Sequence, residues 1–126
     1  RDPPQNFCKE VYMRNQRERG MAAETAACRF LKLQGYEILE RNFTAKTGEI
    51  DIIARQDGWL VFVEVKYRQN TAYGYPGEAV NVRKQNRIRR TAEVYLKKKG
   101  WSFVQPIRFD VVEILGKKIR VIKHAF

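Results

Sequence analysis

Acidic residues and a lysine interrupt segments of the chain that otherwise have the composition of a protein core. The segment Gly48–Ala54 reads Gly-Glu-Ile-Asp-Ile-Ile-Ala, and the segment Trp59–Lys66 reads Trp-Leu-Val-Phe-Val-Glu-Val-Lys. Charged groups are costly to place in a buried strand unless they are paired or bound to a metal. Asp51, Glu64 and Lys66 are therefore the first candidates for a site that carries out a reaction.

The expected strand geometry brings the two acids together. Side chains alternate along a strand, so Glu64 and Lys66 share one face with Phe62. If the two segments pair through a turn at residues 57–58, Asp51 and Glu64 come side by side. At an effective dielectric of about 20, two negative charges about 4 Å apart repel by roughly 4 kcal/mol. Either one carboxyl is protonated or a divalent cation joins the two.

A metal held by these acids would suit the hydrolysis of a phosphodiester. All-oxygen ligation with positions left for water favours Mg²⁺ or Mn²⁺. Such an ion lowers the pKa of a bound water and neutralises charge on the phosphate. Lys66 is expected to orient that water or to stabilise the pentavalent transition state. Glu24, on the core face of the first expected helix, is the candidate for a further carboxylate near the metal.

The alternative reading of these residues is an ordinary solvated strand. Oppositely charged residues two positions apart are common on a half-exposed sheet, and Asp51 or Glu24 taken alone is unremarkable in its element. Leu60 and Phe62, however, precede Glu64 on the same face and have core character. We therefore favour a site over a solvated face.

A single α/β domain accounts for residues 20–126. Hydrophobic periodicity together with turn and cap residues predicts the order α-β-β-β-α-β-β. The expected elements are a helix at Met21–Gln34, strands at Tyr36–Phe43, Glu49–Arg55 and Trp59–Tyr67, a helix at about Gly77–Lys99, and strands at Ile107–Leu115 and Lys118–Lys123. The third strand is almost continuously apolar, which indicates burial on both faces. Residues 1–19 are expected to form a flexible basic N-terminal segment, and whether all of it is native stays open.

The charge balance indicates a polyanionic partner. The 126 residues carry 25 Lys+Arg against 14 Asp+Glu, a formal net charge of +11. Such a balance most often indicates nucleic acid, with an anionic membrane surface as the alternative. No apolar run reaches the roughly 18 residues that span a bilayer, and no signal peptide is recognisable. Two cysteines without CxxC spacing favour reduced thiols and a cytoplasmic location over a zinc site.

Basic and aromatic side chains after the third strand are candidates for contacts with nucleic acid. Five positive charges fall within eight residues of the second expected helix. We expect Arg83, Arg87 and Arg90 to contact phosphates, although such a run is also typical of a solvated helix face. Tyr73 and Tyr75 lie in a loop with Gly and Pro. They would stack on unpaired bases of branched or single-stranded DNA, with packing onto the domain as the alternative.

Two further cations are expected closer to the acidic pair. Arg68 follows the third strand directly and is expected to bind the scissile phosphate. Lys84 falls in the apolar stripe of the second expected helix, between Val80 and Ile88. Its ammonium group is expected either to snorkel to solvent or to reach the active site. Asp110 is expected to have a structural hydrogen-bonding role, with a place behind the metal ligands as the alternative.

The motif formed by Asp51 and Glu64-Val65-Lys66 resembles the PD-(D/E)xK signature of restriction-endonuclease-like nucleases. The wider pattern resembles the YraN-like family, a bacterial group similar to archaeal Holliday-junction resolvases. The matching residues are Glu24, Gly35-Tyr36, Arg41-Asn42, Gly48–Asp51, Phe62–Lys66, Arg68, Gly74, Lys84, Ala92, Tyr95-Leu96, Arg108–Val112 and Ala125-Phe126. Ile50 stands where the short motif has Pro, which leaves the chemistry of the Asp side chain unchanged.

The resemblance implies a fold and a function. The fold is a restriction-endonuclease-like α-β-β-β-α-β core with a central mixed sheet flanked by helices. The site is a metal-dependent nuclease centre with Glu24, Asp51, Glu64 and Lys66 as the catalytic set, and Lys84 reaching into it. The expected activity is a Mg²⁺-dependent DNA endonuclease acting on branched or otherwise structured DNA in repair or recombination, with a homodimer as one implied arrangement. The alternative is a nucleic-acid-binding module that keeps the fold without cutting.

Overall fold

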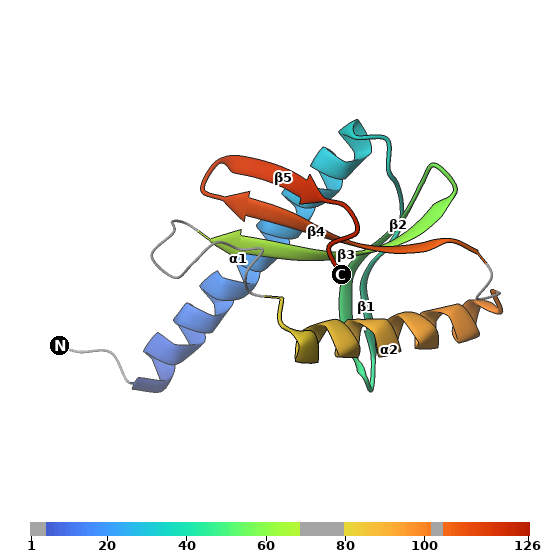
Figure 1. Ribbon diagram of the computed structural model, residues 1–126. Helices are drawn as coiled ribbons and strands as arrows, with labels where there is room; N and C mark the ends of the chain where they lie inside the picture. Colours follow the sequence, from blue (N-terminus) through green and yellow to red (C-terminus); the bar gives the residue numbers. More distant parts are fainter. Residues whose placement is uncertain (1–4, 69–79, 102–104) are drawn as a thin grey trace.

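The computed structural model of the protein describes residues 5–68, 80–101 and 105–126 (Figure 1). Within them the chain forms two α-helices and one five-stranded sheet, in the strand order β1-β2-β3-β4-β5. The elements are α1 (Gln5–Leu33), β1 (Glu37–Ala45), β2 (Gly48–Gln56), β3 (Trp59–Arg68), α2 (Val82–Lys99), β4 (Ile107–Leu115) and β5 (Lys118–Ile122). Strands β3 and β4 run parallel, and the other neighbouring pairs run antiparallel. The predicted element order and mixed sheet are confirmed.

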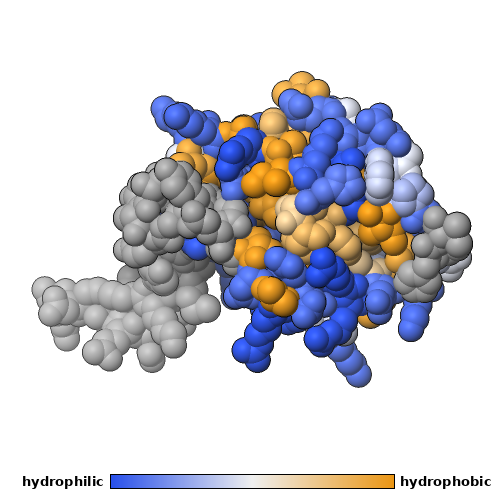
Figure 2. Space-filling view, viewed as in Figure 1, coloured by the Kyte–Doolittle hydropathy of each residue, from blue (hydrophilic) through white to orange (hydrophobic). Residues whose placement is uncertain are grey.

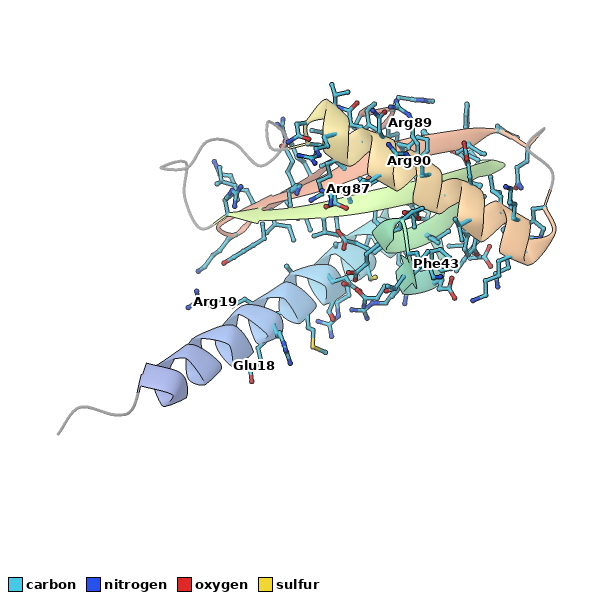
Figure 3. All side chains as sticks on the ribbon, turned by 90° about the horizontal axis from the view of Figure 1, so that it is seen from below. Glu18, Arg19, Phe43, Arg87, Arg89 and Arg90 are labelled. Carbon is cyan, nitrogen blue, oxygen red and sulfur yellow. The ribbon has the colours of Figure 1, made fainter. Side chains whose placement is uncertain are left out.

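The two helices cover opposite faces of the sheet, as Figure 3 shows edge-on. Alternation along β3 explains the arrangement, because successive side chains of that strand enter two separate cores. Val61 and Val63 pack in the core beneath α1, which contributes Leu31. Phe62 packs in the core beneath α2, which contributes Tyr95. Each such fully buried side chain contributes about 1.5–3 kcal/mol relative to exposure, so burial of β3 on both faces holds the three layers together.

A tight hairpin joins β2 to β3, as predicted. Asp57 and Gly58 both have positive φ, 49° and 81°, which is the backbone of a two-residue type I′ turn. The turn sets the register in which Gln56 lies opposite Trp59 and Ile52 lies opposite Val63. Because the register is set at the turn, the positions of Asp51 and Glu64 beyond Ile52 and Val63 follow from it.

The sheet forks beyond that last pair. From Gly48 to Asp51, β2 no longer pairs with β3, whereas Gly48, Glu49 and Ile50 continue to pair with β1. From Glu64 to Arg68, β3 keeps its pairing with β4. The two halves of the sheet therefore separate at Asp51 and Glu64, and a gap opens between strands that are neighbours elsewhere.

A buried polar network ties β4 to the rest of the fold. Asp110 accepts hydrogen bonds from the Tyr36 hydroxyl at 2.7 Å and from Arg108 Nε at 2.9 Å. It also accepts from the backbone N–H of His124 at 3.2 Å, and Arg108 donates to Gln56 Oε1 at 2.6 Å. Asp110 and Arg108 are both buried. The network confirms the structural role predicted for Asp110.

Helix α1 begins at Gln5, whereas we expected the first helix to begin at Met21. The expectation was wrong because the polar composition of residues 5–20 was interpreted as a tail. That stretch contains no proline, and Gly20 inside a helix costs only about 1 kcal/mol relative to alanine. The domain boundary at residue 20 stays a prediction, although the helix runs through it.

Helix α2 begins at Val82, later than the expected start at Gly77. Asn81 ends the preceding segment in an extended conformation, and its side chain accepts a hydrogen bond from the backbone N–H of Lys84 at 2.9 Å. Such a cap satisfies a backbone donor that the first turn leaves free. Val80 consequently lies outside the helix and is not part of its apolar stripe. Within the described residues, no helix combines the length and apolar character needed to cross a bilayer.

Candidate functional site

The two predicted carboxylates meet at the fork of the sheet. Asp51 Oδ2 accepts a hydrogen bond from the backbone N–H of Val65 at 2.8 Å, so the side chain bridges the gap that backbone pairing leaves. Glu64 is 7% exposed and lies on the face covered by α2. Asp51 and Glu64 both line a cleft of about 250 Å³ between the fork and the start of α2. The predicted juxtaposition of the acids is thus present in the fold.

Burial and the charge of Glu64 change the acidity of Asp51. Burial disfavours the ionised form, the Glu64 carboxylate repels it, and the pKa of Asp51 is raised to about 7. The Val65 N–H opposes the shift, and Glu24 adds a smaller repulsive contribution. At neutral pH the Asp51 carboxyl is therefore protonated in about half of the molecules, and protonation is one of the two ways expected to relieve the repulsion.

Two lysines compensate the charge of Glu64. Lys84 Nζ lies 2.7 Å from Glu64 Oε1, and Lys66 Nζ lies 3.4 Å from the same oxygen. Burial lowers the pKa of Lys84, but the hydrogen bonds with Glu64 and Lys66 and the negative charges of the acids together outweigh it, so the net shift of the pKa is upward. For Lys66, burial and the neighbouring Lys84 lower the pKa. Of the alternatives for Lys84, the side chain reaches the acidic pair, and Lys66 is the lysine that gives up its proton more easily.

Glu24 does not join the acidic pair directly. Its carboxylate is held on the α1 side by Arg41 Nε at 3.0 Å and Asn42 Nδ2 at 2.9 Å. Asn42 adopts a left-handed conformation, φ 54°, which asparagine tolerates better than most residues. Across the described ranges, no three His, Cys, Asp or Glu side chains gather around one point that could hold an ion. The predicted ligand set therefore separates into the Asp51–Glu64 pair and a Glu24 that faces it from α1.

The fork opens to both faces of the sheet. Glu49 and Asp51 line the cleft beneath α2, and they also line a second cavity of about 350 Å³ beneath α1. Glu24 borders this second cavity. Glu49 was not among the predicted site residues, and its signal in the sequence was its position two residues before Asp51 on the same strand.

Helix α2 lies close to the β1–β2 turn and forms one wall of the cleft. A Cβ on Gly48 would lie 3.3 Å from Thr91 Oγ1, and Gly48 has φ 149°, so a side chain there would be strained. The Thr47 and Thr91 hydroxyls are 2.9 Å apart. The close approach brings Arg87 to the cleft, opposite Gly48.

Of the described residues predicted to contact nucleic acid, Lys84 and Arg87 line the cleft, whereas Arg68, Arg83 and Arg90 do not. Arg83 and Arg90 are exposed on α2, and Arg68 is half-buried at the end of β3. Tyr73 and Tyr75 lie outside the described residues. Figure 3 shows Arg87, Arg89 and Arg90 on α2, on the side of the sheet opposite to Arg19 of α1. In Figure 2, hydrophilic side chains cover most of the lower part of the α2 face, in keeping with the net charge of +11.

The fold and the fork define the class of protein: a mixed α/β domain with the element order of a nuclease-like core and an acid–lysine cluster where its sheet divides. The chain belongs to the uncharacterised protein family UPF0102, the YraN family, whose model matches residues 23–114. This membership confirms the resemblance found in the sequence.

Relatives from several bacteria share most of the chain. A UPF0102 protein of Lachnoclostridium phytofermentans is 50% identical over 112 residues, which cover 89% of this chain and 95% of the relative. One from Acetivibrio thermocellus is 48% identical over 122 residues, with 89% and 93% covered. One from Clostridium botulinum is 47% identical over 113 residues, with 85% and 92% covered. The family assignment therefore holds across nearly the full length of both partners in each comparison.

Proposed function

We propose that the protein is a metal-dependent nuclease that hydrolyses phosphodiester bonds of DNA at the fork between β2 and β3. The observation that carries the proposal is the pairing of Asp51 with Glu64 in one cleft, beside two lysines. Repelling acids are costly to the fold, and a site that keeps them is typical of catalytic centres. The resemblance to resolvase-like nucleases supports branched or otherwise structured DNA as the substrate.

The acidic pair fits a divalent cation such as Mg²⁺ or Mn²⁺. Both donors are carboxylate oxygens, the ligands these ions prefer, and the cleft leaves room for water. The pKa of Asp51 is raised by burial and by the negative charge of Glu64, and a cation would neutralise that charge. Asp51 and Glu64 would hold the ion, with Glu24 facing it from α1. When bound, the ion supplies a water of lowered pKa and offsets charge on the phosphate.

The surrounding side chains have distinct tasks in this proposal. Lys66 donates a hydrogen bond to the phosphate oxygen on which charge develops, and its lowered pKa lets it exchange a proton with water. Lys84 orients Glu64 through its 2.7 Å contact. Arg87, at the rim of the cleft, binds a neighbouring phosphate. The burial of Glu64 and Lys66 strengthens these interactions relative to those in bulk water.

A cleavage assay tests the proposal. Branched, flap and linear DNA are incubated with the protein in Mg²⁺ or Mn²⁺, alongside Asp51→Ala and Glu64→Ala. The matched control is Glu37→Ala, which removes an exposed acid of β1 outside the cleft. We expect cleavage by wild type and by the control, and none by the two cleft variants. Failure of wild type to cut any substrate, or equal cutting by all proteins, would contradict the proposal.

A second candidate function is nucleic-acid binding without cleavage. The basic surface of α2 and the net charge of +11 favour binding whatever the chemistry of the fork. Binding that weakens steeply with salt, with no cleavage dependent on Asp51 or Glu64, would support this candidate over the nuclease.

A further inference from the structure

A group of cations lies on the α2 side of the sheet, where the hairpin of β4 and β5 extends past the first turn of α2 (Figure 1, Figure 3). Ile119 and Val121 of β5 pack against the core beneath α1. Because side chains alternate along a strand, Lys118 and Arg120 lie on the opposite, α2 side. Both residues are exposed, and the Arg120 side chain is 68% exposed. Neither of them lines the cleft at the fork.

Arg68 lies at the same corner of the sheet. It shares the face of Lys66 by alternation along β3, whereas Tyr67 between them lines cavities on the α1 side. The backbone N–H of Gly116 donates to the Arg68 carbonyl at 2.9 Å, which holds the turn of the β4–β5 hairpin beside the end of β3. We call this group of cations the corner surface, and it consists of Arg68, Lys118 and Arg120.

One row of the sheet connects the corner surface to the proposed site. Lys66 lies opposite Glu113 of β4, and Glu113 lies opposite Arg120 of β5. Glu113 is 5% exposed and forms an ion pair with Arg120, so its charge is compensated within the protein. From residue 116 to residue 120, every exposed side chain is basic. The corner surface therefore presents positive charge to solvent beside the lysine of the site.

We propose that the corner surface binds phosphates of duplex DNA on one side of the scissile bond, while Arg87 binds the backbone on the other side. The inference rests on the proposed function and adds to it the path of the substrate, which crosses the α2 side of the sheet from α2 to β5. Arg87 lies at the cleft opposite Gly48 of β2, so the fork is between Arg87 and the corner surface.

The spacing of the strands suits a DNA backbone. Neighbouring strands lie about 4.8 Å apart, so Arg120 on β5 is about 10 Å from Lys66 on β3 across the sheet. Each strand of a duplex advances about 3.4 Å per nucleotide along the helix axis. A backbone with its scissile phosphate at Lys66 therefore has another phosphate near Arg120 after about three nucleotides.

Salt dependence of duplex binding in EDTA tests the corner surface separately from cleavage. Fluorescence anisotropy follows a labelled blunt duplex at several salt concentrations. Lys118→Ala should reduce the slope of log affinity against log salt by about 1, and the double variant with Arg68→Ala by about 2, because each lost phosphate contact retains its counterion. Arg120 is left intact, since its removal would leave the buried Glu113 without its charge partner.

Lys123→Ala is the matched control. It removes the same charge directly after β5, but the Lys123 ammonium lies 6.0 Å from the centre of the Tyr36 ring, on the α1 side of the sheet. The net charge of the two single variants is equal. A change in slope that depends on net charge alone would therefore appear in both.

The outcomes separate the possibilities. A slope reduced in Lys118→Ala and unchanged in Lys123→Ala supports the corner surface. Equal slopes for wild type and the double variant overturn it, and so does an equal reduction in Lys118→Ala and Lys123→Ala. Loss of binding to phosphatidylserine vesicles in Lys118→Ala, with an unchanged slope for the duplex, assigns the corner surface to an anionic membrane and also overturns it. Cleavage by wild type with unchanged slopes would contradict only the corner surface, whereas the expected slopes without cleavage would contradict only the nuclease proposal.

Discussion

At the scale of single residues, the acidic pair lowers the stability of the folded protein. Asp51 accepts one hydrogen bond from Val65, but burial and the charge of Glu64 raise its pKa to about 7. In the unfolded chain an aspartate titrates near 3.9. The folded protein therefore binds more protons than the unfolded chain between about pH 4 and pH 7, and its free energy of unfolding falls as the pH rises through that window.

Asp51→Asn is expected to relieve this cost. Without metal, the variant should match wild type near pH 4 and exceed its free energy of unfolding by up to about 4 kcal/mol at pH 8, since one pKa unit corresponds to about 1.4 kcal/mol. Urea unfolding at several pH values measures the difference, with Glu37→Gln as the control. If the difference in free energy of unfolding between Asp51→Asn and wild type does not grow with pH, the pKa of Asp51 is not raised in the folded protein.

Lys66 is expected to act on the reaction more than on binding. Lys66→Met should lower kcat for cleavage by about 100- to 1,000-fold, the usual cost of removing one donor to developing charge. Its affinity for DNA should stay close to that of wild type, because Arg87 and the rest of α2 are intact. Single-turnover cleavage and binding measured side by side separate the effects, and a variant weakened only in binding would make Lys66 a docking residue.

At the scale of elements, α2 supplies both a cation for the acids and the wall of the cleft. Asn81 caps its first turn, which brings Lys84 to Glu64, and Arg87 follows one turn later at the rim. The exposed charges at the end of the helix, such as Lys97, lie away from the cleft. The two ends of the same helix are therefore expected to differ in their contact with DNA.

Salt dependence of DNA binding measures that difference. Arg87→Ala should reduce the slope of log affinity against log salt by about 1, the amount expected when one phosphate contact is lost. Lys97→Ala, the same kind of change on the same helix, should leave the slope as in wild type. Equal slopes for Arg87→Ala and wild type would place the bound phosphates elsewhere on the surface.

The helices and strands also show which features of the site could be predicted from the sequence and which could not. Alternation along β3 correctly assigned Glu64 to the face of Phe62, because period-two patterning is local. Lys84 was predicted to lie on the face of the helix that packs against the sheet. It does so although Val80 lies outside the helix, because Lys84 and Ile88 are still one turn apart. The fork could not be predicted, because loss of pairing between β2 and β3 depends on how β1 and β4 hold each half of the sheet.

The position of Glu24 illustrates the same limit. Helical spacing correctly assigned it to the core face of α1, where it is 8% exposed. Its capture by Arg41 and Asn42 depends on the left-handed backbone at Asn42, which no periodicity reports. A carboxylate that was predicted to join Asp51 and Glu64 is therefore held by Arg41 and Asn42 instead.

At the scale of the whole molecule, the two halves of the sheet separate at the fork, and the rest of the fold must hold each half in place. The network around Asp110 connects β4 to Tyr36 after α1 and to the segment that follows β5. The network contains the buried charges of Arg108 and Asp110. Arg108 has few other hydrogen-bond partners. The network stabilises the half of the sheet that carries Glu64, because β4 pairs with β3 along its length.

Asp110→Ala is expected to lower the free energy of unfolding by about 3–5 kcal/mol, because it leaves the buried Arg108 without its charge partner. Tyr36→Phe removes the hydrogen bond that its hydroxyl donates to the same carboxylate and the one that it accepts from Arg108, and should cost about 1.5–3 kcal/mol. Denaturant unfolding monitored by circular dichroism compares the two. A cost for Asp110→Ala no larger than that for Tyr36→Phe would show that the ion pair is dispensable to the fold.

The most direct test of the central claim is the position of a bound metal. Crystals soaked in Mn²⁺ and measured at a wavelength sensitive to manganese locate the ion by its anomalous scattering. We predict a peak within coordination distance of both Asp51 and Glu64, about 2.0–2.2 Å from a carboxylate oxygen of each, and no such peak in Glu64→Ala. A manganese site away from the fork, or none at a concentration that supports cleavage, would contradict the account.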